Sequence, residues 1–270
     1  MEQETLWPTF SRTMLPEKYQ KAVIEAFNEA EYQEIYGLNF SLDPSRWGRA
    51  HENVLRKFLT ANDDNVAEAK TQLLKTLKWR KEFKPLDAAK ENFDEELTKL
   101  GVVTQSPSGK AVTWNLYGIV KDPGQYFAKE DVFIRWRVGL HERALALLDF
   151  ADDKLSTMDQ VHDYMGVSFL RMDSRIKKTS KRVIEMFQLY YPETLSGKYF
   201  VNVPYIMMWV FKLVQGISSA ATMSKFHVLA SGNQLAGSLG DWIPKEYGGS
   251  AETLQSLEVS DNVISQDNVD

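Results

Sequence analysis

The feature that most constrains the fold is the alternation of strand-like and helical segments after about residue 100. Alternating apolar and polar residues predict a strand over 110–118, and helical spacing of apolar residues predicts a long helix over 129–150. Further strands are expected over 160–173 and in the segments KYFVNVP and KFHVLAS, with helical patterns between them. Strands that alternate with helices indicate an α/β fold with a mostly parallel or mixed sheet.

The chain before this region has a different character. Residues 16–99 are expected to be helical throughout, with the polar turn NDD separating two helical patterns. We therefore predict a helical N-terminal lobe over 1–99, an α/β domain over 100–258 and a polar tail over 259–270.

Composition narrows the possible functions. The chain has 270 residues and no cysteine, which excludes disulfides, cysteine–zinc sites, iron–sulfur clusters and thiolate ligation of haem. A net charge of −5 argues against a general nucleic-acid binder, which needs a basic face. Local basic patches leave weak contact with an anionic membrane surface open.

The longest strongly apolar stretch, at 203–214, contains Lys212 and is shorter than the roughly 20 residues that a membrane span needs. The acidic N-terminus does not resemble a signal peptide. We therefore expect an intracellular, soluble protein with peripheral membrane contact at most.

The familiar enzyme motifs are absent. Neither a phosphate-binding glycine loop nor H-E-x-x-H nor G-x-S-x-G occurs, and no nucleophile is paired with a base. We expect a binding protein and no enzyme.

One strand carries an unusual pair of side chains. His162 and Tyr164 stand two residues apart near the start of the strand expected over 160–173. Side chains at this spacing share one face of a strand, about 6–7 Å apart. From the residues alone, two interpretations stay open: the pair binds a ligand, or both are hydrogen-bonded polar residues of a pocket or core.

Four separated motifs carry a family resemblance: FLTANDDNVAEAKTQLLKTLKWRKEF, VHDYMGVS, YYPETLSGKYFVNVP and KEYGG. Their order and spacing resemble the CRAL-TRIO lipid-transfer family over roughly residues 45–250. The resemblance implies a helical N-terminal lobe before a sheet that forms the floor of an apolar pocket for one lipid. A mobile gate helix would roof the pocket, and it would fall on 205–215, a stretch rich in methionine and aromatic residues. A buried core helix is the alternative for that stretch.

Within the family, the segments KAVTWNLYG and HDYMGVSFLRMDSRIK resemble the fungal non-classical phosphatidylinositol-transfer proteins that bind haem. That resemblance implies haem b in a closed pocket, with Tyr164 as the iron ligand and His162 as its neighbour. It also implies a surrounding shell of Tyr117, Arg137 and Lys198.

The chemistry of this set is coherent. Tyrosine binds ferric iron as a phenolate, and proteins use it as a haem ligand. A nearby cation such as Arg137 favours the charged phenolate. Such ligation suits a carrier or sensor better than an oxygen-binding protein. Alternatives remain for each shell residue: a surface salt bridge for Arg137, a solvated lysine for Lys198, and a half-buried strand tyrosine for Tyr117.

The resemblance also points to a lipid headgroup site. Glu193, Thr222 and Lys225 match the family's headgroup residues, whereas Asn62 and Asp63 replace basic residues of phosphoinositide-binding relatives. Acidic and neutral side chains there weaken a phosphate site.

We thus expect a cytoplasmic haem b-binding protein that is peripheral on the endoplasmic reticulum or microsomal membrane. It would also transfer phosphatidylinositol and influence phosphoinositide homeostasis or the response to oxidants. Its partners would be haem, phosphatidylinositol and a membrane surface, and not nucleic acid. Phosphatidylinositol transfer without functional haem is the alternative, and a catalase- or peroxidase-like haem enzyme is the least favoured.

Overall fold

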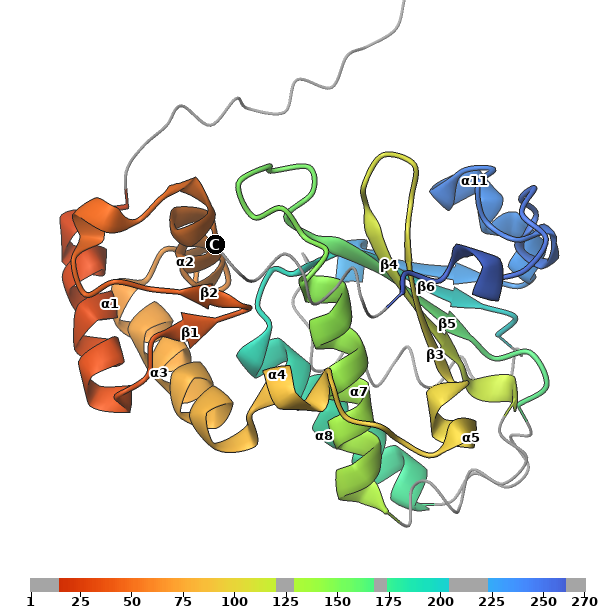
Figure 1. Ribbon diagram of the computed structural model, residues 1–270, viewed down its shortest axis with the longest axis horizontal. Helices are drawn as coiled ribbons and strands as arrows, with labels where there is room; N and C mark the ends of the chain where they lie inside the picture. Colours follow the sequence, from red (N-terminus) through yellow and green to blue (C-terminus); the bar gives the residue numbers. More distant parts are fainter. Residues whose placement is uncertain (1–14, 120–128, 168–173, 204–222, 261–270) are drawn as a thin grey trace, which may run out of the picture.

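The computed structural model describes residues 15–119, 129–167, 174–203 and 223–260 (Figure 1). The gate helix expected over 205–215, Thr222 and the expected tail beyond residue 260 lie outside the described residues.

The N-terminal part contains three main helices and a small hairpin. The bounds are α1 Glu17–Ala30, β1 Glu34–Ile35, β2 Leu38–Asn39, α2 Arg49–Thr60, α3 Val66–Phe83, α4 Pro85–Ala88 and α5 Glu95–Thr98. The turn NDD separates α2 from α3 as predicted, and the Asn65 side chain caps α3 by accepting from the N–H groups of Ala67 and Glu68.

The expectation of an entirely helical segment over 16–99 is wrong at the hairpin. Strands β1 and β2 pair antiparallel around a two-residue turn, Tyr36–Gly37. Both turn residues have positive φ, 55° and 86°, as a tight hairpin turn of this kind requires. The helical spacing of the flanking apolar residues hides this short turn in the sequence.

A five-stranded mixed sheet forms the centre of the rest of the chain (Figure 1). Its order is β3-β4-β5-β6-β7; β3 and β4 are antiparallel and the other neighbours are parallel. The remaining bounds are β3 Gly101–Gln105, β4 Ala111–Leu116, α7 Glu130–Leu145, β5 Met158–Asp163, α8 Ser174–Tyr190, β6 Leu195–Val201, β7 Phe226–Leu229 and α11 Ala236–Leu239. The predicted α/β fold with a mixed sheet is confirmed.

Strand β5 is shorter than the strand expected over 160–173. It ends at Asp163, whose side chain accepts a hydrogen bond from the Met165 N–H, and Gly166 follows with a φ of 81°. An aspartate that accepts from the N–H two residues on, followed by a glycine of positive φ, starts a turn. Tyr164 therefore lies just beyond the end of the strand.

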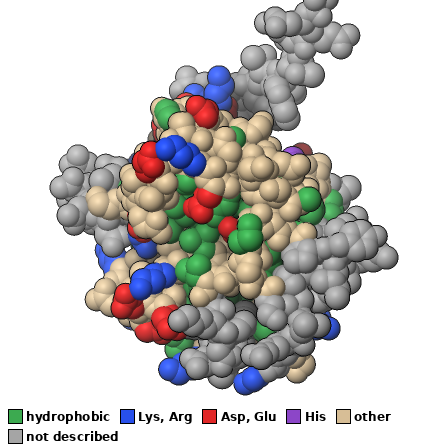
Figure 2. All heavy atoms as spheres, turned by 90° about the vertical axis from the view of Figure 1, so that its right-hand side faces the viewer, with side chains coloured by type: hydrophobic (Ala, Val, Ile, Leu, Met, Phe, Trp, Pro, Cys, Tyr) green, Lys and Arg blue, Asp and Glu red, His purple; other side chains and the backbone are tan. Residues whose placement is uncertain are grey.

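The two faces of the sheet differ sharply. One face packs against the C-terminal segment in an apolar cluster that includes Trp114, Val161, Tyr199, Leu235 and Tyr247. The opposite face meets α7, which packs on β3 and β4 and also contacts α8 (Figure 1). Figure 2 shows the side of the molecule where the C-terminal segment lies, with apolar side chains in the middle of that face and acidic side chains among them.

Within the described residues, no helix has the length and apolar character to cross a bilayer.

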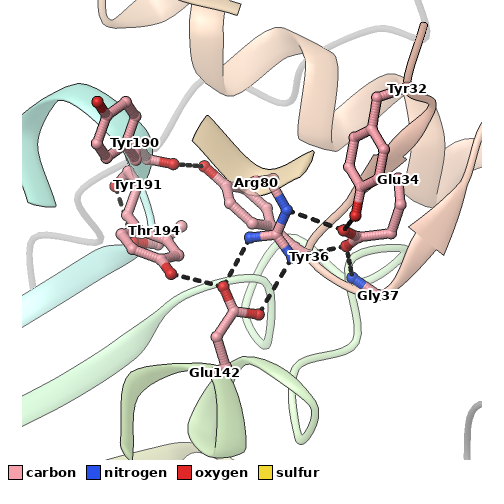
Figure 3. Close-up of polar contacts among 9 residues, drawn as sticks. All are labelled: Tyr32, Glu34, Tyr36, Gly37, Arg80, Glu142, Tyr190, Tyr191 and Thr194. Carbon is pink, nitrogen blue, oxygen red and sulfur yellow. Dashed lines mark hydrogen bonds and ion pairs between the residues drawn. The ribbon is translucent and has the colours of Figure 1, made fainter. Parts of the chain in front are cut away.

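A buried ion cluster joins the N-terminal part to α7 (Figure 3). The fully buried Arg80 of α3 donates to Glu34 of β1 and to Glu142 of α7, and the closest nitrogen–oxygen distance is 2.6 Å in each case. Tyr191 also donates to Glu142, at 2.6 Å. We call Arg80, Glu34 and Glu142 the interlobe ion cluster. It links α7 to α3 and β1 of the N-terminal part.

Candidate functional site

The face of the sheet toward α7 carries two rows of side chains, and all but one of them are polar. Because neighbouring strands are in register, residues that pair across β4, β5 and β6 point to the same side. One row consists of Thr113, Gln160 and Lys198, and the next of Asn115, His162 and Phe200. A largely polar surface is thus buried under α7, whereas the face of a sheet that packs against helices is usually apolar.

Tyr117 and Tyr164 follow the ends of two neighbouring parallel strands, β4 and β5, so both extend this surface at the same edge. The Tyr117 hydroxyl lies 3.2 Å from Nδ1 of His162. The Tyr117 ring is 5.7 Å from the His162 ring and 5.5 Å from the Tyr164 ring. The structure brings these three predicted residues together, although Tyr117 lies in a 3-10 turn and not in a strand.

Arg137 reaches the same space from α7. It is 3% exposed, so the interpretation of a surface salt bridge is wrong. Its guanidinium lies 4.9 Å from the centre of the Phe187 ring, and Nη2 donates to Oε1 of Gln160 at 3.5 Å. Burial lowers the pKa of Arg137, while the neighbouring Tyr117 acts in the opposite direction. Arginine nevertheless keeps its charge in proteins, so a cation is held inside the fold.

Lys198 supplies a second basic group, which is half-buried. Its ammonium lies 5.6 Å from the ring centres of both Phe200 and Phe226. Burial, and then the nearby Arg137, lower the pKa of Lys198 to about 7. It is therefore not a freely solvated lysine, although part of its side chain stays accessible. Tyr117 and Tyr164 are also only half-buried by surface area, yet burial raises the pKa of each phenol.

The charges and hydrogen-bonding atoms of this surface are incompletely satisfied. Among the described residues, Arg137 and Lys198 form no ion pair, and five buried side-chain atoms of this region have no hydrogen-bond partner. These atoms are Thr113 Oγ1, Asn115 Oδ1, Arg137 Nη1, His141 Nε2 and His162 Nε2. Buried polar atoms without partners are rare and costly in folded proteins. Such a cluster beside two uncompensated cations suits a polar, anionic ligand.

The residues present fit haem in their chemistry. Tyr164 and His162 offer an oxygen and a nitrogen donor, and Arg137 and Lys198 offer positive charge for the carboxylates of a porphyrin. Burial, then Lys198 and Arg137, hold the pKa of His162 well below its usual value, so the ring is a neutral donor. Burial raises the pKa of Tyr164, so a bound ferric ion would have to stabilise its phenolate. Within the described part of the chain, no group of three His, Cys, Asp or Glu side chains could hold a bare metal ion.

Glu193 and Lys225, which the sequence predicts to bind a lipid headgroup, form a second polar group at the start of β6. Lys225 Nζ lies 2.8 Å from Oε2 of Glu193, and the buried Lys57 of α2 donates to the Glu193 carbonyl at 2.9 Å. Glu193 has a φ of 52°, the left-handed region that non-glycine residues rarely adopt. Thr222 lies outside the described residues. Of the two replaced basic positions, Asn62 bonds within its own lobe, to the Phe58 carbonyl and the Gln72 side chain.

Sequence reasoning missed Gln160, His141 and Lys57. Gln160 lies two residues before His162 on the same strand, and His141 lies four residues after Arg137 on the same helix. These spacings place Gln160 on the same strand face as His162, and His141 on the same helix face as Arg137. No local signal marked Lys57, because its partner Glu193 is 136 residues away in the sequence.

Comparison with known proteins gives a consistent result. Residues 95–249 match the family described as the CRAL/TRIO domain. A phosphatidylinositol transfer protein SFH5 from Kluyveromyces lactis is 46% identical over 237 residues, which cover 86% of this chain and 79% of the relative. A protein of the same name from Cryptococcus neoformans is 40% identical over 279 residues, covering 94% and 93%.

A solved structure is also similar. The crystal structure of Sfh5 superposes with a TM-score of 0.82 at 36% sequence identity, over 92% of this chain and 94% of that one. Both the helical N-terminal part and the mixed sheet therefore have a counterpart of known architecture.

Proposed function

The chain belongs to the CRAL/TRIO family, and from that premise we propose that it is a phosphatidylinositol transfer protein that also binds haem b through Tyr164. The observation that carries the haem proposal is the buried cationic surface around Arg137 and Lys198, which holds no carboxylate among the described residues. The lipid-transfer part rests on similarity to proteins that carry that name.

When bound, haem supplies a ferric ion that favours an anionic oxygen ligand. The chain's own residues would then act around it. Tyr164 would hold the iron through its phenolate oxygen. The Tyr117 hydroxyl and Nδ1 of His162, which are 3.2 Å apart, would set the hydrogen bonding beside that oxygen. Arg137 and Lys198 offset the negative charge of the propionates. Arg137 and His162 are buried, which strengthens their interactions with a bound group relative to those in water.

The lipid proposal uses the other polar group. Glu193 and Lys225 form a half-buried ion pair that can exchange partners with the hydroxyls and phosphate of an inositol headgroup. Lys57 donates a hydrogen bond to the Glu193 carbonyl and so stabilises the left-handed backbone conformation of Glu193. Binding at the headgroup site and haem binding use different residues, so the two activities can be tested separately.

Hemin titration tests the haem proposal. The wild-type protein should develop a Soret band that changes sharply in Tyr164→Phe. Tyr199→Phe is the matched control, because it removes the same hydroxyl from the opposite, apolar face of the sheet. A protein that stays colourless with added hemin, or a Tyr164→Phe spectrum identical to that of the control, would reject the proposal.

A vesicle-to-vesicle assay tests lipid transfer. Wild-type protein should move phosphatidylinositol faster than a protein-free control, and Glu193→Ala and Lys225→Ala should slow that transfer. Lys78→Ala is the matched control, since Lys78 forms an ion pair with Glu29 on the N-terminal lobe at 2.9 Å. Transfer no faster than without protein would remove this part of the proposal.

A further inference from the structure

Two buried polar contacts connect His141 of α7 to Gln160 of β5, and Gln160 in turn to Arg137 of α7. His141 Nδ1 lies 3.2 Å from Nε2 of Gln160, and Gln160 Oε1 accepts from Arg137 Nη2 at 3.5 Å. All three side chains are buried, with exposures of 1%, 4% and 3%. Arg137 and His141 are one turn apart on the helix, and Gln160 lies between them on β5.

The donors and acceptors of this chain can be assigned without seeing hydrogen atoms. A guanidinium only donates, so the Gln160 atom that faces Arg137 must be the carbonyl oxygen. The other end of the amide is then NH2, which also only donates. His141 Nδ1 must therefore be an unprotonated acceptor, with the ring proton on Nε2.

The surroundings of His141 agree with a neutral ring. Burial, followed by Arg137, Lys198 and Arg80, holds the pKa of His141 well below its usual value. Its ring meets Phe187 and Tyr191 edge-on, with centres 4.7 and 4.4 Å apart. The ring is thus fixed by packing, and among the described residues Nδ1 is the only ring nitrogen of His141 with a polar partner.

We propose that His141 is a positioning residue, which acts through the Gln160 amide to hold the Arg137 guanidinium beside Tyr117 and the bound anion. The effect on ligand binding rests on the proposed haem site. The order of donors and acceptors from Arg137 through Gln160 to His141 is a property of the ligand-free protein. Without an acceptor at position 141, the amide loses its fixed orientation. Its NH2 group is then left without a partner, and the side chain can rotate away from the position in which its oxygen accepts from Arg137.

Nitrogen NMR of the ligand-free full-length protein tests the polarity directly. Two-bond proton–nitrogen correlations at neutral pH report which ring nitrogen carries the proton in each of the four histidines. His141 should carry it on Nε2, and the signal is assigned by its loss in His141→Phe. In Gln160→Glu the carboxylate can only accept, so His141 should switch to protonation at Nδ1. Protonation at Nδ1 in the wild type, or no switch in Gln160→Glu, would overturn the proposal.

Hemin binding tests the consequence. His141→Phe keeps a ring against Phe187 and Tyr191 but removes the acceptor, and it should weaken hemin binding about threefold to tenfold, the loss expected for one hydrogen bond. His141→Asn, whose side-chain oxygen can replace Nδ1, should restore most of the affinity. His227→Phe, on the exposed strand β7, is the control that should change nothing.

A double-mutant cycle separates positioning from a general effect on folding. In an Arg137→Met background, His141→Phe should cause no further loss of hemin affinity, because the residue it positions is gone. An equal loss in both backgrounds would overturn the proposal. If the wild type does not bind hemin, the proposed function fails, and the NMR result alone decides the role of His141.

Discussion

Arg80 on α3 donates from Nη1 to Oε1 of Glu142 on α7 at 2.6 Å, a contact between residues 62 positions apart in the sequence (Figure 3). The same guanidinium bonds Glu34, and Glu34 also accepts from Tyr32 and from the Gly37 N–H. Each carboxylate is thus held by several donors, which is the condition under which a buried ion cluster is tolerated.

Removing the cation should be severely destabilising. Arg80→Met leaves two buried carboxylates without their counter-charge, and we expect a loss of about 3–5 kcal/mol in the free energy of unfolding. Urea unfolding followed by circular dichroism measures it. Lys78→Met, which breaks the exposed pair with Glu29, should cost no more than about 1 kcal/mol. Equal losses for the two variants would show that the interlobe ion cluster does not stabilise the fold.

Lys198 should lower the stability of the ligand-free protein and raise its affinity for hemin. Lys198→Met removes a partly desolvated amine that has no counter-charge among the described residues, so the ligand-free protein should become more stable by about 1 kcal/mol. The same change should weaken hemin binding by roughly tenfold, since one charge facing the propionates is lost. Thermal unfolding and hemin titration give the two values, with the exposed Lys90→Met as control. A variant that loses stability and keeps its affinity contradicts this expectation.

Gly118 should be intolerant of a side chain. A Cβ at this position would overlap the carbonyl oxygen of Met165, so the two backbones could not keep their approach. Gly118→Ala should lower the free energy of unfolding by about 1–3 kcal/mol and also disturb hemin binding, because Tyr117 and Tyr164 flank the contact. Gly237→Ala, where a Cβ meets nothing within 4 Å, should stay within about 0.5 kcal/mol of the wild type.

Burial of Lys57 should make the free energy of unfolding depend on pH. Burial lowers the pKa of Lys57 in the folded chain to about 8, below its ordinary value of 10.5. Below pH 8 both states are protonated and the cost of burial is constant. Between about pH 8 and 10 the unfolded chain binds more protons, so the free energy of unfolding should rise with pH, by about 2 kcal/mol from this group.

The comparison of variants isolates that contribution. Lys57→Met should flatten the rise between pH 8 and 10 relative to the wild type, whereas Lys78→Met should keep the wild-type slope. Urea midpoints measured at several pH values provide the test. Parallel curves for wild type and Lys57→Met would mean that Lys57 titrates near its ordinary pKa.

Much of the fold follows from local patterns. Strands β4, β6 and β7 and helices α7 and α8 appear where apolar periodicity predicted them, because each buries one face against a neighbouring layer. Strand β3, Gly101–Gln105, was not predicted. The hairpin at Tyr36–Gly37 was missed because its strands have only two residues each. The end of β5 was misplaced because apolar residues continue past Asp163, while the turn depends on one aspartate side chain and on Gly166.

The candidate site is a different case. The resemblance to a family named Tyr117, Arg137, His162, Tyr164 and Lys198, and the structure brings these residues into one region. Their burial could not be read from the sequence, because Arg137 and Lys198 are ordinary surface residues by composition. What removes them from water is the register of three strands and the docking of α7, and both depend on contacts between distant parts of the chain.

The interlobe ion cluster also bears on how the protein can be divided. A fragment cut to the residues that match the family, 95–249, would discard Arg80 and Glu34 but retain Glu142 on α7. Among the described residues, that carboxylate would keep only Tyr191 as a donor, beside apolar side chains that the N-terminal helices no longer cover. Truncation at this boundary should therefore yield an aggregating product, and expression, crystallisation or domain-swap designs should begin upstream of α1.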